Sequence, residues 1–133
     1  MTSATLSTNK TFDYLINTTN FSPDTESILG SPFNYHDCSL LIIPTDVPTP
    51  QSENYMEYVT TNIIQSGTAA GGRTMALFTS HSAVRQAFIL LNQKMQDSNI
   101  AVLAQGLSGT PGRLLRRFKQ HPATILLGTS SFW

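Results

Sequence analysis

The sequence predicts an α/β fold in which helices flank a parallel sheet. Four short apolar runs of strand length alternate with three amphipathic segments of helix length, and Gly, Pro, Ser or Thr marks the junctions. Strands and helices that alternate in this way form parallel sheets with right-handed connections. The length of 133 residues is enough to bury a core of domain size.

The first third of the chain is polar and rich in turn-forming residues. Phe12, Leu15 and Ile16 have helical spacing, so a short helix is expected there, and residues 22–37 are expected to form loops. The run "SLLII", residues 39–43, ends at a proline and predicts the first buried strand. A loop marked by prolines follows at residues 46–52.

The remaining segments alternate between helix and strand. Tyr55, Val59 and Ile63 lie four apart and predict a helix that Ser52 caps and that ends at Gly67. The next helix, residues 82–96 with Ser82 as a cap, and the last helix, residues 109–121, each have one apolar face: Val84, Ala87, Phe88, Leu91 and Met95 in the first, and Leu114, Leu115 and Phe118 in the second. Strands are expected at residues 74–79, 99–106 and 123–128.

The composition excludes several classes of protein. Only 12% of the residues are charged and the formal net charge is zero, so no overall field attracts nucleic acid, although a local basic stripe can still do so. The one cysteine, Cys38, cannot form an internal disulfide or hold a zinc ion or iron–sulfur cluster alone. No signal peptide and no apolar run of about 20 residues is present, so a cytoplasmic location is expected.

The stretch "GTAAGGRT", residues 67–74, matches G-x-x-x-x-G-K-[ST] except that Arg73 replaces the lysine. A phosphate-binding loop follows a strand and precedes a helix, whose N-terminal N–H groups face the phosphates. Here the predicted helix comes first and the predicted strand second. The sequence therefore predicts a helix end and a turn at these glycines, and not a nucleotide-binding loop.

In a parallel α/β sheet, ligands bind at the carboxyl ends of the strands. The candidate positions are residues 44–45, 79–81, 105–106 and 128–131. Several carry hydroxyl groups or glycine, which suit contacts with phosphate oxygens. The same residue types are typical of any strand-to-helix junction, so both interpretations remain open.

Four segments together resemble the DinG/XPD-like branch of superfamily 2 helicases. "TSATLSTNKTFDYL" resembles motif III of that family, and "SPFNYHDCSLLIIPTDVPTP" resembles the entry to its second motor domain. "GGRTMALFTSHSAVRQAFILL" resembles motif IV, and "ILLGTSSFW" resembles the start of motif V. The order and spacing agree, and the resemblance covers essentially the whole chain.

The resemblance implies a RecA-like fold of the P-loop NTPase type. Residues 1–31 would be the tail of a first motor domain and a linker, and residues 32–133 an incomplete second motor domain. Proteins of this family are ATP-driven DNA helicases, in which the first domain carries the phosphate-binding loop and the acidic box that binds Mg²⁺. This chain has neither, it lacks motif VI, and it lacks the four cysteines of an iron–sulfur cluster. It is therefore expected to be a helicase fragment that binds no cofactor and hydrolyses no ATP alone, with ATP and Mg²⁺ as cofactors of a longer protein.

The resemblance also assigns candidate residues, and no catalytic or metal site is expected. The residues that would couple the nucleotide state to DNA binding are Ser3, Ala4 and Thr5 in motif III and Gly128 and Thr129 in motif V. Those that would contact nucleic acid are Thr79, Ser80, His81, Ser130, Ser131, Arg113, Arg116 and Arg117. Each has a structural alternative: a frayed N-terminus for residues 3–5, a helix cap at Ser80 or Ser82, a polar loop end for residues 128–131, or a solvated helix face for the arginines. Phe132 and Trp133 either stack on bases or pack.

The function expected from these features is part of an ATP-dependent DNA helicase of the DinG type, concerned with DNA repair. Its expected partners are single-stranded DNA, bound through the longer protein, and the first motor domain, with no membrane. The alternative is a non-catalytic module that binds single-stranded nucleic acid or a helicase partner.

Overall fold

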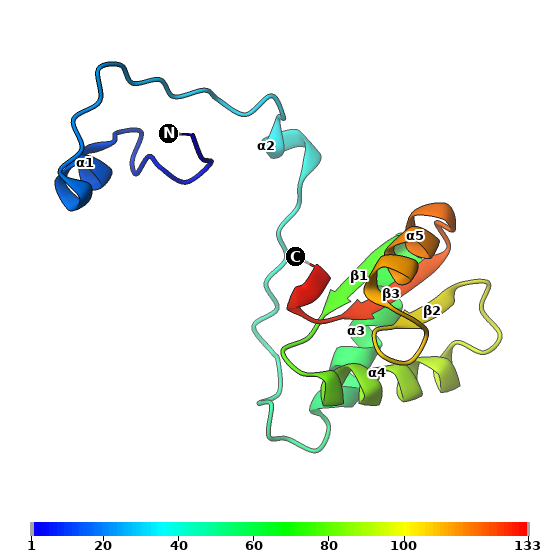
Figure 1. Cartoon of the computed structure of the whole chain (residues 1–133). Helices are drawn as coiled ribbons and strands as arrows, with labels where there is room; N and C mark the ends of the chain where they lie inside the picture. The colour runs from blue at the N-terminus through cyan, green and yellow to red at the C-terminus, as the bar shows by residue number, and fades with distance from the viewer. Residues whose placement is uncertain (1, 133) are drawn as a thin grey trace. The chain divides into compact units, whose positions relative to one another are not determined.

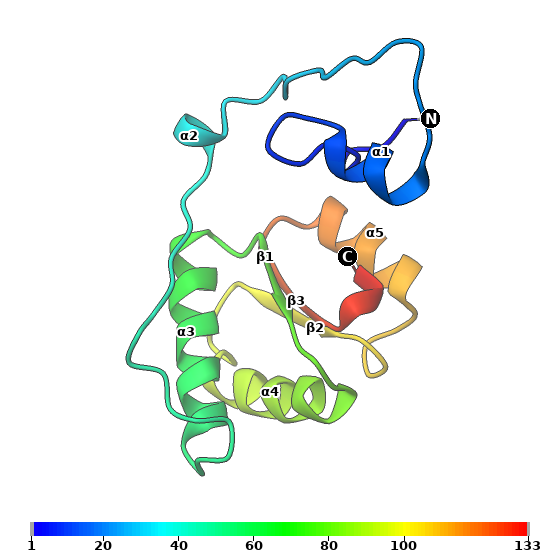
Figure 2. The ribbon, with the colours of Figure 1, turned by 90° about the vertical axis from the view of Figure 1, so that its left-hand side faces the viewer.

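The computed structural model describes residues 2–132, which form two compact units that divide after Ile43. Figures 1 and 2 show the ribbon from two directions. The second unit contains all the strands of the described residues and most of the buried side chains.

The first unit contains two short helices, α1 (Asp13–Thr19) and α2 (Tyr35–Cys38), and neither buries a residue. The short helix expected around Phe12 is confirmed as α1, which ends at Asn20 in the left-handed conformation. The hydroxyls of Thr18 and Thr19 donate to the carbonyls one turn earlier, each at 2.7 Å.

The prediction of a strand at residues 39–43 is wrong. These residues belong to no sheet in the described part of the chain, and the side chains of Leu40 to Ile43 are 72–84% exposed. An apolar, β-prone run becomes a strand only when another strand supplies hydrogen-bond partners. Consequently, Pro44 and Thr45 do not follow a strand, and this candidate ligand position is also wrong.

The sheet of the second unit has three parallel strands, β1 (Thr74–Leu77), β2 (Ala101–Ala104) and β3 (Thr124–Gly128), in the order β1-β3-β2. All five residues of the central strand β3 are buried. The parallel α/β fold is therefore confirmed, with three strands in place of four. This architecture is consistent with part of a RecA-like domain.

Helices cover both faces of the sheet (Figure 2). Alternate residues of β3 point to opposite faces, as in any strand. Ile125 and Leu127 pack with α3 (Tyr55–Ala69) and α4 (His81–Lys94), whereas Leu126 packs with α5 (Pro111–Gln120). Most of the expected inward residues are confirmed: Val84, Ala87, Leu91, Met95 and Leu114 are buried, and Phe88 and Phe118 are partly buried against the two clusters. Leu115 is only half-buried and belongs to neither cluster.

Two details of the helix ends differ from expectation. Helix α3 continues past Gly67 to Ala69, and Gly67 is a buried residue within the helix. Only glycine fits there, because a Cβ would stand 2.5 Å from Ile125 Cδ1. Ser52 does not cap α3, since its hydroxyl bonds the hydroxyl of Thr49 at 2.8 Å and the N-cap residue is Asn54. Close packing of the helix on β3, and not a helix end, explains this glycine.

Candidate nucleic-acid interface at the carboxyl edge of the sheet

The three strands end at one edge of the sheet. The backbone N–H of Phe78, just after β1, donates to Gly128 O at 2.8 Å, and that of Gln105, just after β2, donates to Leu127 O at 3.0 Å. Because β3 lies between the other two strands, the three loops that leave this edge are neighbours. Residues 79–81, 105–106 and 128–131 are thereby brought together from distant parts of the sequence.

The side chain of Gln105 fixes the loop after β3. Its Oε1 accepts from the backbone N–H of Thr129 at 2.8 Å and from the Thr129 hydroxyl at 3.0 Å. Its Nε2 donates to Ser131 Oγ at 2.7 Å. Gln105 stands at a predicted strand end, but a single glutamine carries no motif signal and therefore predicts no function. The contact with Thr129 and Ser131, more than 20 residues away, exists only in the folded chain.

The turn that follows holds Phe132 against the sheet. Residues Ser130–Phe132 form a short 3-10 helix, and the Phe132 ring lies directly on Gly128, where no Cβ would fit. The ring also packs with the cluster of Leu103, Leu114 and Leu126. The packing interpretation of Phe132 is confirmed, and Trp133 lies outside the described residues.

The loop after β1 leads directly into α4. Ser80 is the N-cap of α4: its Oγ accepts from Ala83 N at 3.2 Å, so the capping interpretation is confirmed for Ser80. The Ser82 hydroxyl bonds the Ser80 hydroxyl at 2.9 Å and does not cap the helix. Thr79 and His81 are exposed on either side of the cap.

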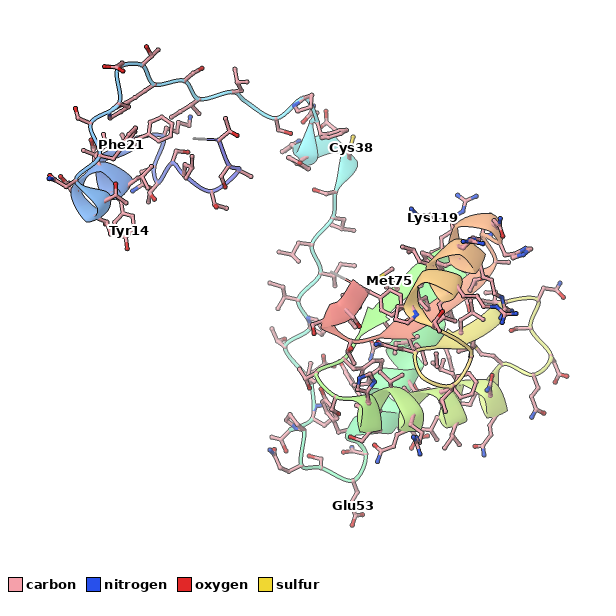
Figure 3. All side chains as sticks on the ribbon, viewed as in Figure 1. Tyr14, Phe21, Cys38, Glu53, Met75 and Lys119 are labelled. Carbon is pink, nitrogen blue, oxygen red and sulfur yellow. The ribbon has the colours of Figure 1, made fainter. Side chains whose placement is uncertain are left out.

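Helix α5 presents an arginine face to solvent. Successive helical residues are about 100° apart, which places Arg113, Arg116 and Arg117 on one side and Leu114 and Phe118 on the other. The three arginines are exposed, whereas Leu114 is fully buried. Because α5 starts in the loop that leaves β2, Arg113 lies in the turn nearest the carboxyl edge. Lys119 lies in the last turn (Figure 3).

The candidate residues of the first unit form a local cluster of their own. Ser3 Oγ is 3.3 Å from both the backbone N and the Oγ1 of Thr5, and Ser3, Ala4 and Thr5 are all exposed. The hydrogen bonds of Ser3 and Thr5 are therefore local contacts within the first unit.

Residues 67–74 do not fit the phosphates of ATP. They form the end of α3 and the turn into β1, the reverse of the order that a phosphate-binding loop requires. The N–H groups that would face phosphates are used internally: Gly72 N donates to Gly67 O, and Arg73 N donates to Pro122 O, each at 2.7 Å. The predicted turn is confirmed, whereas the helix ends at Ala69 and not at Gly67.

The part of the chain that the structure describes has neither a metal-ligand cluster nor a membrane-spanning helix. No three or more His, Cys, Asp or Glu side chains gather there in a way that could hold a metal ion. Of the described helices, none is both long and apolar enough to cross a bilayer.

Curated relatives match the whole chain. It is 34% identical to "3'-5' exonuclease DinG" of Bacillus subtilis, 33% identical to "ATP-dependent DNA helicase YoaA" of Haemophilus influenzae and 33% identical to "ATP-dependent helicase DinG" of Mycobacterium tuberculosis. This chain is homologous to a segment of the DinG and YoaA proteins. The matches cover 99–100% of the chain but only 15–20% of each relative. No protein-family profile and no solved structure matches it.

Proposed function

We propose that this chain supplies a nucleic-acid-contacting part of the second motor domain of a DinG-type, ATP-dependent DNA helicase. The observation that carries the proposal is the convergence of three strand-end loops at one edge of the sheet, beside the helix with the arginine face. The homology to DinG and YoaA proteins over the whole chain supports it. In this proposal, the chain runs from motif III to the start of motif V.

Single-stranded DNA is the ligand whose chemistry suits this edge. Hydroxyls and arginines contact phosphate oxygens, which hold the strand in place without reading its sequence. The exposed residues available for such contacts are Thr79, His81, Ser130, Ser131 and Arg113. Helices α4 and α5 also begin at this edge, and the partial positive charge of their N-termini favours anions there. Arg116 and Arg117 extend the basic surface along α5.

ATP hydrolysis in this proposal depends on groups outside the described residues. Phosphoryl transfer requires the phosphates and Mg²⁺ to be held by positioned lysine, hydroxyl and carboxylate groups, and residues 67–74 do not provide them. We assign to Ser3, Ala4, Thr5, Gly128 and Thr129 a role in coupling the nucleotide state to DNA binding, on the resemblance to motifs III and V. We expect no ATP turnover by the 133-residue chain, with or without single-stranded DNA. Turnover that persists in a highly purified sample would contradict this expectation.

A non-catalytic module that binds single-stranded nucleic acid is the second candidate. The poor fit of residues 67–74 to ATP favours this non-catalytic module. The module would bind nucleic acid at the same carboxyl edge of the sheet. The DNA on both sides of the reading frame distinguishes the two candidates. A phosphate-binding loop and an arginine-containing motif VI in frame would support the helicase.

The interface is tested by fluorescence anisotropy with a labelled dT20 oligonucleotide between 50 and 200 mM NaCl. Replacing Arg113 and Arg116 together by alanine should weaken binding about tenfold. It should also reduce the slope of log affinity against log salt by about 1.4, because each phosphate contact on a single strand contributes about 0.7.

The matched control removes two charges from the opposite edge of the sheet. Arg73 precedes β1, and Lys94 ends α4 before β2 begins. Replacing both by alanine should change the affinity less than twofold. Equal losses in the two double variants would show attraction to charge in general and would contradict an interface at the carboxyl edge.

A further inference from the structure

The amide of Gln105 has a fixed orientation. The backbone N–H of Thr129 can only donate, so the Gln105 atom 2.8 Å from it must be the amide oxygen. The amide nitrogen therefore faces Ser131 Oγ at 2.7 Å, and Ser131 must be the acceptor in that bond. The directions of these hydrogen bonds follow from the chemistry of the groups, without any choice of hydroxyl rotamer.

This orientation has opposite consequences for the two hydroxyl residues of the loop. Thr129 is 8% exposed and directs both its N–H and its O–H at Gln105 Oε1, so it has no donor left for a ligand. Ser131 is exposed and accepts from Gln105, so its own hydroxyl proton remains available. The Thr129 Oγ1 atom is 3.4 Å from Ser131 Oγ, which is long for an O–H···O bond.

We propose that Gln105 is a positioning residue that presets the Ser131 hydroxyl as a hydrogen-bond donor for a backbone phosphate oxygen of single-stranded DNA. Phosphodiester oxygens only accept hydrogen bonds, so a hydroxyl whose lone pair is occupied and whose proton is free is complementary to them. Thr129 then acts through the loop and does not touch the strand. The identity of the ligand rests on the proposed function, whereas the role of Gln105 rests on the geometry of the loop.

Gln105→Glu is the variant that separates this role from simple support of the loop. A carboxylate at this position still accepts both hydrogen bonds of Thr129, so the loop keeps its anchor. The carboxylate cannot donate to Ser131, and the Ser131 hydroxyl would donate to it. The substitution therefore reverses the direction of one hydrogen bond and withdraws the proton that we assign to the DNA.

The experiment measures dT20 binding by four forms of the 133-residue chain: the unmodified chain, Ser131→Ala, Gln105→Glu and the double variant. Ser131→Ala should weaken binding about tenfold or more in the unmodified chain, as expected for a lost hydrogen bond to a charged acceptor. In the Gln105→Glu background the same change should weaken it less than twofold. The added charge is present in both members of that pair and cancels. An equal effect of Ser131→Ala in the two backgrounds would overturn the proposal.

NMR of the free chain tests the role of Gln105 without DNA. The Thr129 amide should be protected from hydrogen exchange in the unmodified chain and in Gln105→Glu, and should lose protection in Gln105→Ala. One Gln105 Nε2 proton should shift upfield in Ser131→Ala, because its acceptor is gone. If these signatures are found but dT20 does not bind, the proposed function and the assigned ligand fail while the positioning role stands. If they are absent, the positioning role fails whatever the chain binds.

Discussion

Individual glycines in this chain are explained by what lies beside them. A glycine inside a helix costs about 1 kcal/mol relative to alanine, yet Gly67 occupies the interior of α3. A Cβ at this position would stand 2.5 Å from Ile125 Cδ1 and 3.0 Å from Ile125 Cγ1, and Ile125 is fully buried in the core. At the residue scale, the stretch that looks like a phosphate-binding loop is therefore a packing feature.

Gly71 and Gly72 provide a matched pair at the same turn. Both have positive φ, +61° and +94°, but Gly71 has open space around it. A Cβ on Gly72 would stand 2.5 Å from Pro122 O and 2.6 Å from Ala123 Cα, and closer still to Thr124 N. These are backbone atoms at the start of the central strand and just before it, and they cannot move aside without disturbing β3.

Gly72→Ala should therefore destabilise the fold by about 3 kcal/mol or more, from the left-handed conformation and the steric clash together. Gly71→Ala should cost only about 1 kcal/mol, from the conformation alone. Urea unfolding followed by circular dichroism measures both. Equal losses of stability in the two variants would contradict the close approach of Gly72 to the backbone before β3.

At the scale of single elements, α5 shows how one helix serves two purposes. Its buried residue, Leu114, joins Leu103 and Leu126 in the cluster on one face of the sheet. Its arginines, Arg113, Arg116 and Arg117, are exposed on the solvent side. The spacing of apolar and basic residues predicts both faces, because the helical period alone determines them.

Leu114→Ala should destabilise the second unit by about 3 kcal/mol, the usual cost of removing a fully buried leucine side chain. Arg116→Ala should change the free energy of unfolding by less than about 0.5 kcal/mol, because the side chain is exposed. Thermal and urea unfolding of the two variants checks this contrast. A large loss of stability in Arg116→Ala would show that the arginine face is structural.

At the scale of the whole molecule, two features leave hydrogen-bonding groups and apolar surface exposed. Strands β1 and β2 each have one neighbour, β3, so each has an open edge among the described residues. Residues 39–43 expose four consecutive large apolar side chains. Open strand edges and exposed apolar runs promote association between chains.

We therefore expect the 133-residue chain to associate as its concentration rises. Replacing Leu41 and Ile43 by lysine should reduce this association without lowering stability, because both side chains are more than 70% exposed. Sedimentation velocity between 5 and 200 μM measures the effect. A chain that stays monomeric over this range, or associates equally with both lysines in place, would refute the role of residues 39–43.

The sequence alone determined the features that depend on local periodicity and connection. The buried faces of α4 and α5, the parallel sheet and the helix-to-strand context of residues 67–74 all follow from spacing and alternation. The carboxyl edge as the meeting point of residues 79–81, 105–106 and 128–131 follows from parallel strands. Periodicity reports which side of an element is apolar, and that information is local.

Only the tertiary structure decided which segments find partners. Residues 39–43 have the composition of a buried strand but remain exposed, because a strand requires a neighbour to complete its hydrogen bonds. The sequence around Gly67 predicts a helix end, but Gly67 lies within α3. A glycine stands there because Ile125 of β3 packs against it. The bonds of Gln105 to Thr129 and Ser131 join residues more than 20 positions apart. Contacts across such separations depend on how β2 and β3 align, which no local pattern encodes.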